Sequence, residues 1–153
     1  MNEVKNKIGN LRSWERQKEN LSKNCINCKS TVHQRYAIRG SIYLINFGEN
    51  IGSEINKKRP GLIVSNRTNN LNSDNVVALP ITKTLVINKK THRPKYSSQY
   101  FLYKSKYTFL DFDSCVKCEQ IRTISKARIL KYLGNLDKDD LKNIILKLNK
   151  FFS

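Results

Sequence analysis

Hydrophobic and polar positions change their pattern near residue 39. Beyond that point, short apolar runs alternate with polar, turn-forming segments, which predicts short strands joined by loops. Gly40–Phe47 ("GSIYLINF") is rich in Ile, Tyr, Leu and Phe and predicts a buried strand. A second strand, "GLIVSN", is started by Pro60, and a third spans Val76–Thr82, where Pro80 indicates an edge or a bulge. Two later runs, "YFLYKS" and "CEQIRTI", predict further strands, whereas the Asn-rich "NRTNNLNSDN" predicts a turn.

The C-terminal segment carries the clearest helical pattern. Asp137 is suited to cap this helix, and Asp140 lies three residues on, as in a capping box. Apolar residues recur at helical spacing and form one face: Leu141, Ile144, Ile145, Leu148 and Phe152. The preceding "SKARILKYLG" predicts a shorter helix that ends at Gly134. Many short strands followed by a helix predict an α+β fold with a strongly bent sheet or a small β-barrel.

Residues 1–38 differ from the rest of the chain. They are polar and basic, and their few apolar residues recur at helical spacing: Val4, Ile8, Leu11 and Trp14. This pattern predicts a short amphipathic helix within a partly disordered segment. We therefore divide the chain into a basic N-terminal extension, residues 1–38, and a domain, residues 39–153.

The net charge of the chain indicates which kinds of molecule it binds. The chain has 29 Lys and Arg against 12 Asp and Glu, a formal net charge of +17. Such an excess attracts nucleic acid, an anionic membrane surface or an acidic protein. No segment approaches the run of about 18 apolar residues that a membrane helix needs, and the N-terminus lacks the apolar core of a secretory signal. These features predict a cytoplasmic protein.

The segment Lys83–Lys106 adds a second basic signal, with seven Lys or Arg and no acid. Four aromatic residues are interleaved with these cations: Tyr96, Tyr100, Phe101 and Tyr103. Cations that follow a phosphate backbone, beside aromatic rings that stack on unpaired bases, suit single-stranded nucleic acid. A charged loop beside a strand whose aromatics belong to the core explains the same pattern.

The four cysteines form two C-x-x-C pairs, Cys25–Cys28 and Cys115–Cys118. Two such pairs are suited to a tetrahedral Cys₄ zinc site, structural because every coordination position would be filled. Residues three apart on a regular strand point to opposite faces, so the second pair needs a turn or bulge to share a metal. The alternative is that Cys115 and Cys118 are core residues.

Four sequence blocks occur in order: "RGSIYLINFG", "IGSEINKKRPGLIVSN", "VVALPIT" and "DSCVKCEQIRTISKARI". Together they resemble the MazF/PemK family, the endoribonuclease toxins of type II toxin–antitoxin systems, over residues 39–152. The resemblance implies a compact, SH3-like β-barrel with a C-terminal helix, acting as a homodimer. It also implies metal-independent, sequence-specific cleavage of single-stranded RNA and pairing with an acidic antitoxin.

The resemblance also assigns site residues. The arginine of the family's "RP" motif falls on Arg59, and the threonine that ends "PIT" falls on Thr82. These two are the expected catalytic residues. In this family the ribose 2′-hydroxyl attacks the adjacent phosphorus and leaves a cyclic phosphate and a 5′-hydroxyl. The residues expected to bind RNA are Ser53, Lys57, Lys58 and Gln120.

Two positions depart from the family pattern: Ser41 and Arg67 stand where many members carry an acid. Both make the chain more basic, which we expect to alter the cleaved sequence or the antitoxin pairing. The residues leave two alternatives open: a non-catalytic, zinc-stapled module that binds nucleic acid on the same fold, and a toxin whose target is a protein such as gyrase. His33 and His92 have no visible orienting partner, so a two-histidine ribonuclease is the weaker interpretation.

Overall fold

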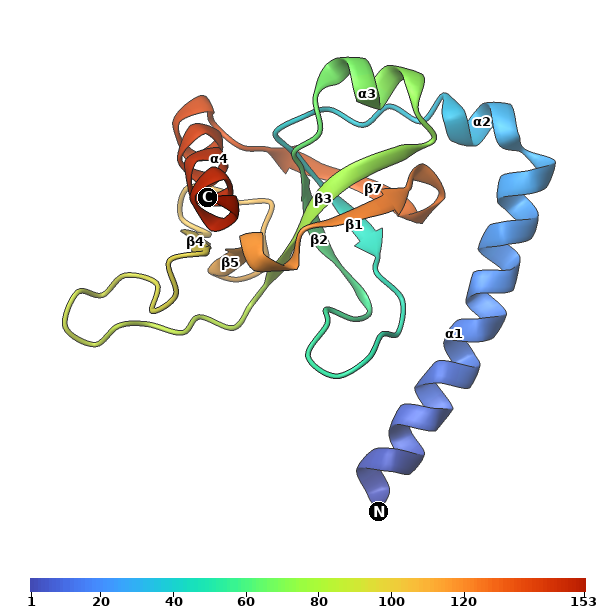
Figure 1. Cartoon of the computed structure of the whole chain (residues 1–153), viewed down its shortest axis with the longest axis horizontal. Helices are drawn as coiled ribbons and strands as arrows, with labels where there is room; N and C mark the ends of the chain where they lie inside the picture. The colour runs from blue at the N-terminus through green and yellow to red at the C-terminus, as the bar shows by residue number, and fades with distance from the viewer.

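The computed structural model describes residues 1–153 and shows an antiparallel sheet with helices at its periphery (Figure 1). The strands are β1 (Ser41–Asn46), β2 (Lys58–Ile63), β3 (Asn75–Thr82), β4 (Gln99–Leu102), β5 (Ser114–Lys117), β6 (Arg122–Ser125) and β7 (Ile129–Asn135). The helices are α1 (Asn2–Asn27), α2 (Lys29–His33), α3 (Arg67–Asn72) and α4 (Lys138–Phe152), with 3-10 turns η1 (Cys118–Gln120) and η2 (Lys126–Arg128). No helix of the chain has the length and apolar character that crossing a bilayer requires.

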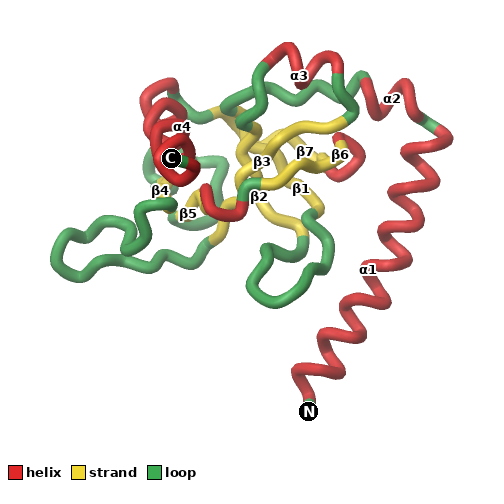
Figure 2. The backbone as a smooth tube through the Cα atoms, in the orientation of Figure 1, coloured by secondary structure: helices red, strands yellow, loops and turns green.

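The sheet confirms the predicted α+β class. Its strands follow the order β4-β5-β3-β2-β1-β7, and β6 also pairs with β3. The strands gather at the centre of the molecule, while helices and loops surround them (Figure 2). The sheet is not closed into a barrel, because no pairing joins β4 to β7.

Strand β3 lies at the centre of this sheet, so the edge position predicted from Pro80 is wrong. On one side β3 pairs with β2, where Pro80 is opposite Gly61. On the other side its first half pairs with β6 and its last two residues pair with β5. Leu79 and Pro80 lie between these two partners, so the proline, which has no N–H to donate, falls where that side of the ladder is interrupted.

Four local predictions were wrong. "SKARILKYLG" forms η2 and then β7, because pairing along β1 outweighs the local helical pattern. The Asn-rich segment contains α3, whose N-cap is Asn66: its side chain accepts a hydrogen bond from the Asn69 backbone N–H at 2.9 Å. Strand "CEQIRTI" begins with η1, and only Arg122–Ser125 is extended. Pro60 lies inside β2, which starts earlier at Lys58.

The predicted C-terminal helix is confirmed. Asp137 accepts a hydrogen bond from the Asp140 backbone N–H at 2.8 Å. Ile144 and Leu148 are buried in the core together with Leu79 of β3 and Val116 of β5, so α4 covers that part of the sheet. Phe152 is 66% exposed and does not belong to the buried face.

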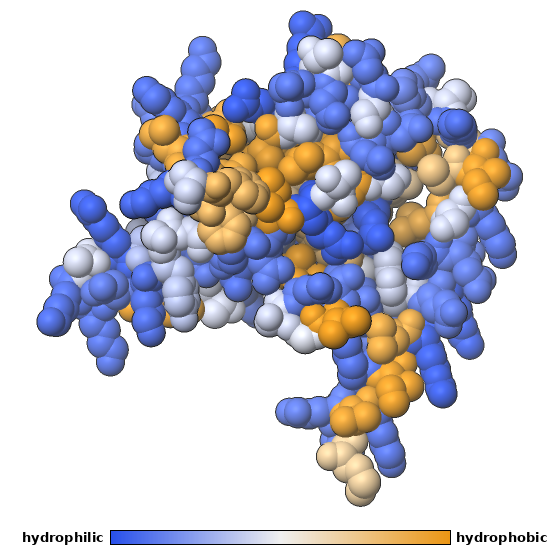
Figure 3. Space-filling view, viewed as in Figure 1, coloured by the Kyte–Doolittle hydropathy of each residue, from blue (hydrophilic) through white to orange (hydrophobic).

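The N-terminal extension is more helical than its sequence predicted. Helix α1 has 26 residues, and none of them is buried. It runs down one side of the molecule, outside the sheet (Figure 1). Three of its apolar residues, Val4, Ile8 and Leu11, are exposed, and the space-filling view shows an apolar strip toward the N-terminal end of the helix (Figure 3).

Asp140 joins α4 to β4 and to the segment that follows it. It accepts hydrogen bonds from the hydroxyl of Tyr100 at 2.5 Å, from the ammonium of Lys106 at 2.7 Å, and from the hydroxyl of Tyr107. Burial alone raises the pKa of Asp140, but the hydrogen bonds from Lys106, Tyr100 and Tyr107 outweigh it and lower that pKa below its ordinary value.

We expect Asp140→Asn to lower the free energy of unfolding by about 1–3 kcal/mol at neutral pH, because these donors lose a charged acceptor. The folded-state pKa of Asp140 is depressed, so its contribution is present above the unfolded-state pKa and is lost as the pH falls through the folded-state value. Urea unfolding at neutral and acidic pH should show the difference shrinking in acid. Asp139→Asn, at an exposed position next to it, is the matched control. An equal effect of the two substitutions would contradict the assigned role of Asp140.

Candidate active site

Strand pairing and one hydrogen bond fix the position of Arg59. It lies on β2 opposite Ile45 of β1, directly after the loop that joins these strands. Its Nε donates a hydrogen bond to the Asn56 carbonyl at 2.7 Å. The terminal nitrogens of the guanidinium have no hydrogen-bond partner in the chain, so the outer edge of the fork is available to an anion.

Thr82 ends β3, where it pairs with Cys115 of β5. The residue is 5% exposed, and its hydroxyl is buried without a hydrogen-bond partner. Buried hydroxyls in folded proteins are almost always paired, so an orphan of this kind requires an explanation. The "PIT" strand thus ends in a buried hydroxyl without a partner in the chain.

Arg59 and Thr82 line the same hollow, which has a volume of about 510 Å³. Its charged lining residues are Lys58, Arg59, Lys83 and Lys131 against a single acid, Asp111. Phe112 also lines it, and the Lys83 ammonium lies 5.5 Å from the centre of this ring. Four cations around one cavity favour an anionic ligand.

Sequence reasoning missed several of these lining residues. Lys83 belongs to the basic segment recognised in the sequence, but nothing there placed it beside Arg59. Lys131 was assigned to a helix, and only its true position on β7 brings it to the hollow. Asp111 and Phe112 lie in a loop whose path depends on the tertiary fold.

Gln120 does not line this hollow. Its side-chain Oε1 accepts a hydrogen bond from the Ile55 backbone N–H at 3.0 Å, and its Nε2 donates to the Ser53 carbonyl at 2.9 Å. Gln120 therefore connects the turn before β6 with the β1–β2 loop, which leads to Arg59. Of the residues expected to bind RNA, Gln120 and Ser53 lie together, and Lys58 lines the hollow of Arg59.

We expect Gln120→Ala to loosen the β1–β2 loop, because it removes the two hydrogen bonds that attach the loop to this side chain. The Gln120 side chain is partly exposed, so we expect the domain to stay folded. Each such bond contributes about 1 kcal/mol. Amide hydrogen exchange should be faster at Ile55 and unchanged at the core position Leu79. Unaltered exchange at Ile55 would show that Gln120 does not hold the loop.

Lys57 has an unusual backbone. Its φ of 71° is in the left-handed region, which a lysine adopts only when the surroundings enforce it. Its backbone N–H donates to the Gly48 carbonyl at 2.6 Å, and its carbonyl accepts from the Phe47 N–H at 3.0 Å. The exposed side chain of Lys57 lines a second hollow, beside α1, and not the hollow of Arg59.

The structure does not form the Cys₄ site that the cysteine spacing suggested. Cys25 and Cys28 lie at the C-terminal end of α1, whereas Cys115 and Cys118 are buried in and after β5. No group of three or more potential metal ligands is present in the chain. Burial, with a smaller effect of Glu119, raises the pKa of Cys115 to about 11 and that of Cys118 to about 12. These two residues are core thiols, as the alternative interpretation held.

The two departures from the family pattern lie away from this site. Ser41 begins β1, is 1% exposed, and donates a hydrogen bond to Asn135 Oδ1 at 2.6 Å. Arg67 begins α3. Both lie toward the end of the β1–β2 hairpin opposite the loop that leads to Arg59 (Figure 1), so they add no charge beside the hollow of Arg59. Their effect on the cleaved sequence or on antitoxin pairing stays a prediction. His33 is hydrogen-bonded to Asp74 at 2.6 Å, and neither histidine lines the hollow.

Comparison with known proteins assigns this sequence and fold to one class of protein. The sequence model described as "PemK-like, MazF-like toxin of type II toxin-antitoxin system" matches residues 38–152. An endoribonuclease MazF from Staphylococcus saprophyticus is 34% identical over 106 residues, which are 69% of this chain and 82% of that protein. The chain therefore belongs to the PemK/MazF family of type II toxin–antitoxin toxins.

Solved structures share the fold. A MazF crystal structure from Deinococcus radiodurans has a TM-score of 0.61 and 21% identity, and the match covers 78% of this chain and 98% of that one. An endoribonuclease in complex with its cognate antitoxin, from a mycobacterial species, has a TM-score of 0.58 and 23% identity, with 76% and 94% covered. The family match begins at residue 38, so α1 and α2 lie outside it.

Proposed function

We propose that the chain is a sequence-specific endoribonuclease that cleaves single-stranded RNA without a metal ion. The observation that carries this proposal is one cationic hollow lined by Arg59, whose guanidinium has free terminal nitrogens, and by Thr82, whose hydroxyl is buried without a partner. The relative from Staphylococcus saprophyticus, an endoribonuclease, supports it.

In the proposed reaction, the ribose 2′-oxygen forms a bond to the adjacent phosphorus while the bond from phosphorus to the 5′-oxygen breaks. The 2′-hydroxyl loses its proton and the leaving 5′-oxygen gains one, so the products are a cyclic phosphate and a 5′-hydroxyl. Negative charge grows on the phosphoryl oxygens in the transition state. Arg59 offers these oxygens a rigid pair of donors, which stabilises them more strongly as the charge grows.

We assign Thr82 a second role at the same phosphate. Its hydroxyl has no partner inside the chain and is buried in this structure, so we propose that it turns toward the hollow and donates to the phosphate when RNA is bound. Threonine is too weak a base to remove the 2′-proton unaided, and orientation of the phosphate is the role that we propose. Lys58 and Lys83 add long-range attraction for the RNA backbone.

We further propose that the chain acts as a homodimer in the cytoplasm and that an acidic antitoxin segment neutralises it. The net charge of +17 supports an acidic partner, and the mycobacterial relative was solved with its cognate antitoxin.

The test is to map the ends of RNA fragments produced by the purified chain with EDTA present. We expect cuts at a short recurrent motif, with 5′-hydroxyl ends and cyclic phosphates. Cleavage that requires an added metal, or fragments with 5′-phosphates, would contradict the proposed mechanism. Complete absence of cleavage across a transcriptome would overturn the assignment of activity.

A further inference from the structure

Helix α1 encloses a second hollow beside the candidate active site. The hollow has a volume of about 400 Å³, within the usual range of about 300–1,000 Å³ for ligand sites. One wall comes from α1, with Asn10, Ser13, Trp14 and Gln17; the other comes from the end of β1, the β1–β2 loop and the start of β2. Lys58 lines both this hollow and that of Arg59, so the two adjoin.

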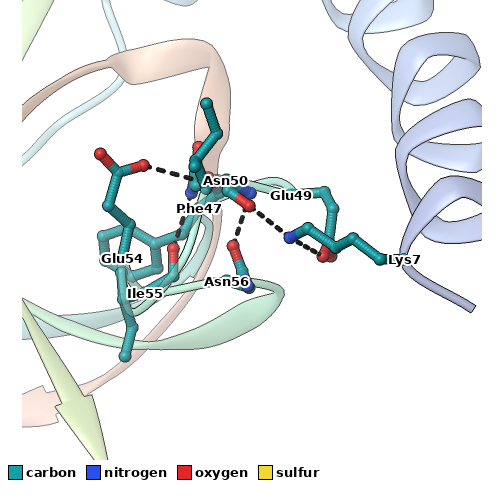
Figure 4. Close-up of polar contacts among 8 residues, drawn as sticks. Lys7, Phe47, Glu49, Asn50, Glu54, Ile55 and Asn56 are labelled. Carbon is teal, nitrogen blue, oxygen red and sulfur yellow. Dashed lines mark hydrogen bonds and ion pairs between the residues drawn. The ribbon is translucent and has the colours of Figure 1, made fainter. Parts of the chain in front are cut away.

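Specific contacts hold α1 at this position. The Lys7 ammonium pairs with the Glu49 carboxylate at 2.5 Å and also donates to the Asn50 carbonyl (Figure 4). Further along the helix, Gln17 accepts a hydrogen bond from the Asn46 side chain at 3.4 Å. The extension is thus attached to the residues that lead to Arg59.

The Trp14 ring packs tightly against the β1–β2 loop at Gly48. A Cβ on Gly48 would lie 2.6 Å from the Trp14 ring, so only glycine fits there, and the φ of 81° at Gly48 also favours glycine. The Arg128 guanidinium lies 5.2 Å from the centre of the same ring. These contacts fix the width of the hollow between helix and loop.

The charge of the hollow suits an anion. Its only acid is Glu49, whose side chain is 8% exposed and is paired with Lys7. Lys57 and Lys58 are exposed and make no ion pair. The strained backbone of Lys57 is enforced at this point, a kind of strain that concentrates at functional sites.

We propose that this hollow is a second RNA subsite, which holds a single-stranded segment next to the nucleotide cleaved at Arg59. Lys57 and Lys58 bind its phosphates, and the amide and hydroxyl groups of Asn10, Ser13 and Gln17, beside the Trp14 ring, contact its bases. The N-terminal extension then belongs to the RNA-binding surface. This inference rests on the proposed function, because it takes the hollow of Arg59 to be the cleavage site.

The test compares two variants of the full chain that carry equal charge. Asn10→Asp combined with Ser13→Asp places two carboxylates in the wall of the hollow. Asn20→Asp combined with Asn24→Asp places two on exposed positions of the same helix that do not line it. We expect the first variant to raise KM about tenfold with kcat unchanged, and the second to raise KM about twofold or less.

RNA length provides an independent readout. Substrates trimmed stepwise from either end should lose affinity for the wild type once the segment in the second hollow is removed. The first variant should show no such step. Equal KM values for the two variants, or an identical length dependence, would overturn the subsite. So would weaker binding of an acidic antitoxin peptide by the first variant with its RNA kinetics unchanged.

Failure of the proposed function is distinguishable from failure of this inference. If the wild type cleaves no RNA, the endoribonuclease assignment fails. The subsite is then tested by binding of an oligonucleotide in which 2′-deoxy residues remove the attacking hydroxyls. A wild-type chain that binds it more tightly than the first variant supports the hollow, and equal binding refutes it.

Discussion

Arg59→Ala should reduce RNA cleavage by at least about a hundredfold while leaving the fold intact, because removal of one charge-stabilising donor from an active site commonly costs about 10²–10³ in kcat. The loss should appear in kcat more than in KM, since the guanidinium stabilises charge that grows only in the transition state. Arg59 is partly exposed, and Nε donates its one side-chain hydrogen bond within the chain, to Asn56. The alanine variant therefore loses little of the folding free energy.

Single-turnover cleavage by wild type and variant measures this effect, with urea unfolding as the check on folding. Arg67→Ala is the matched control, because it removes an exposed arginine that lies away from the hollow. We expect the control to retain its rate within about twofold, as surface substitutions do. Wild-type turnover by Arg59→Ala would remove Arg59 from the mechanism.

Thr82→Val should inactivate the enzyme and stabilise the fold at the same time. Valine has nearly the shape of threonine and suits a strand, but it lacks the hydroxyl that is buried without a partner. An unsatisfied buried polar group costs about 1–3 kcal/mol, so we expect the free energy of unfolding to rise by about 1 kcal/mol. Cleavage should fall by about 10²-fold if the hydroxyl orients the phosphate.

Opposite changes in stability and rate separate this prediction from simple structural damage. Thr82→Ser keeps the hydroxyl and should retain most of the activity. Thr123→Val, at an exposed position on β6, is the control for threonine replacement within a strand. A Thr82→Val chain that is both active and less stable would show that the hydroxyl has a structural partner.

The sequence predicted the elements whose local pattern and tertiary position agree. In helix α4, the N-cap and the spacing of apolar residues agree with the burial of Ile144 and Leu148. In the first predicted strand, Ile42 and Ile45 are fully buried. The local sequence pattern wrongly predicted a helix at residues 129–135, where pairing with β1 makes the segment a strand. Such pairing joins segments far apart in the sequence, so a local window cannot reveal it.

In the candidate site, too, the sequence predicted some features and missed those that depend on tertiary contacts. Arg59 and Thr82 were found through the family motifs, and the fold brings them to one hollow. Gln120 was predicted to bind RNA, and this stays a prediction; the sequence did not reveal its hydrogen bonds to the β1–β2 loop, more than sixty positions away. The spacing within each cysteine pair suggested zinc ligands. That spacing gives no information on the distance between the two pairs, which depends on the fold.

The separation of the cysteines has a practical consequence. Cys115 and Cys118 are buried and their raised pKa values keep them as unreactive thiols, whereas Cys28 is exposed at the end of α1. A maleimide fluorophore or nitroxide added to the native protein is therefore directed to the N-terminal extension. Its signal reports the movement of α1 when RNA or a partner binds, with no cysteine introduced by mutation.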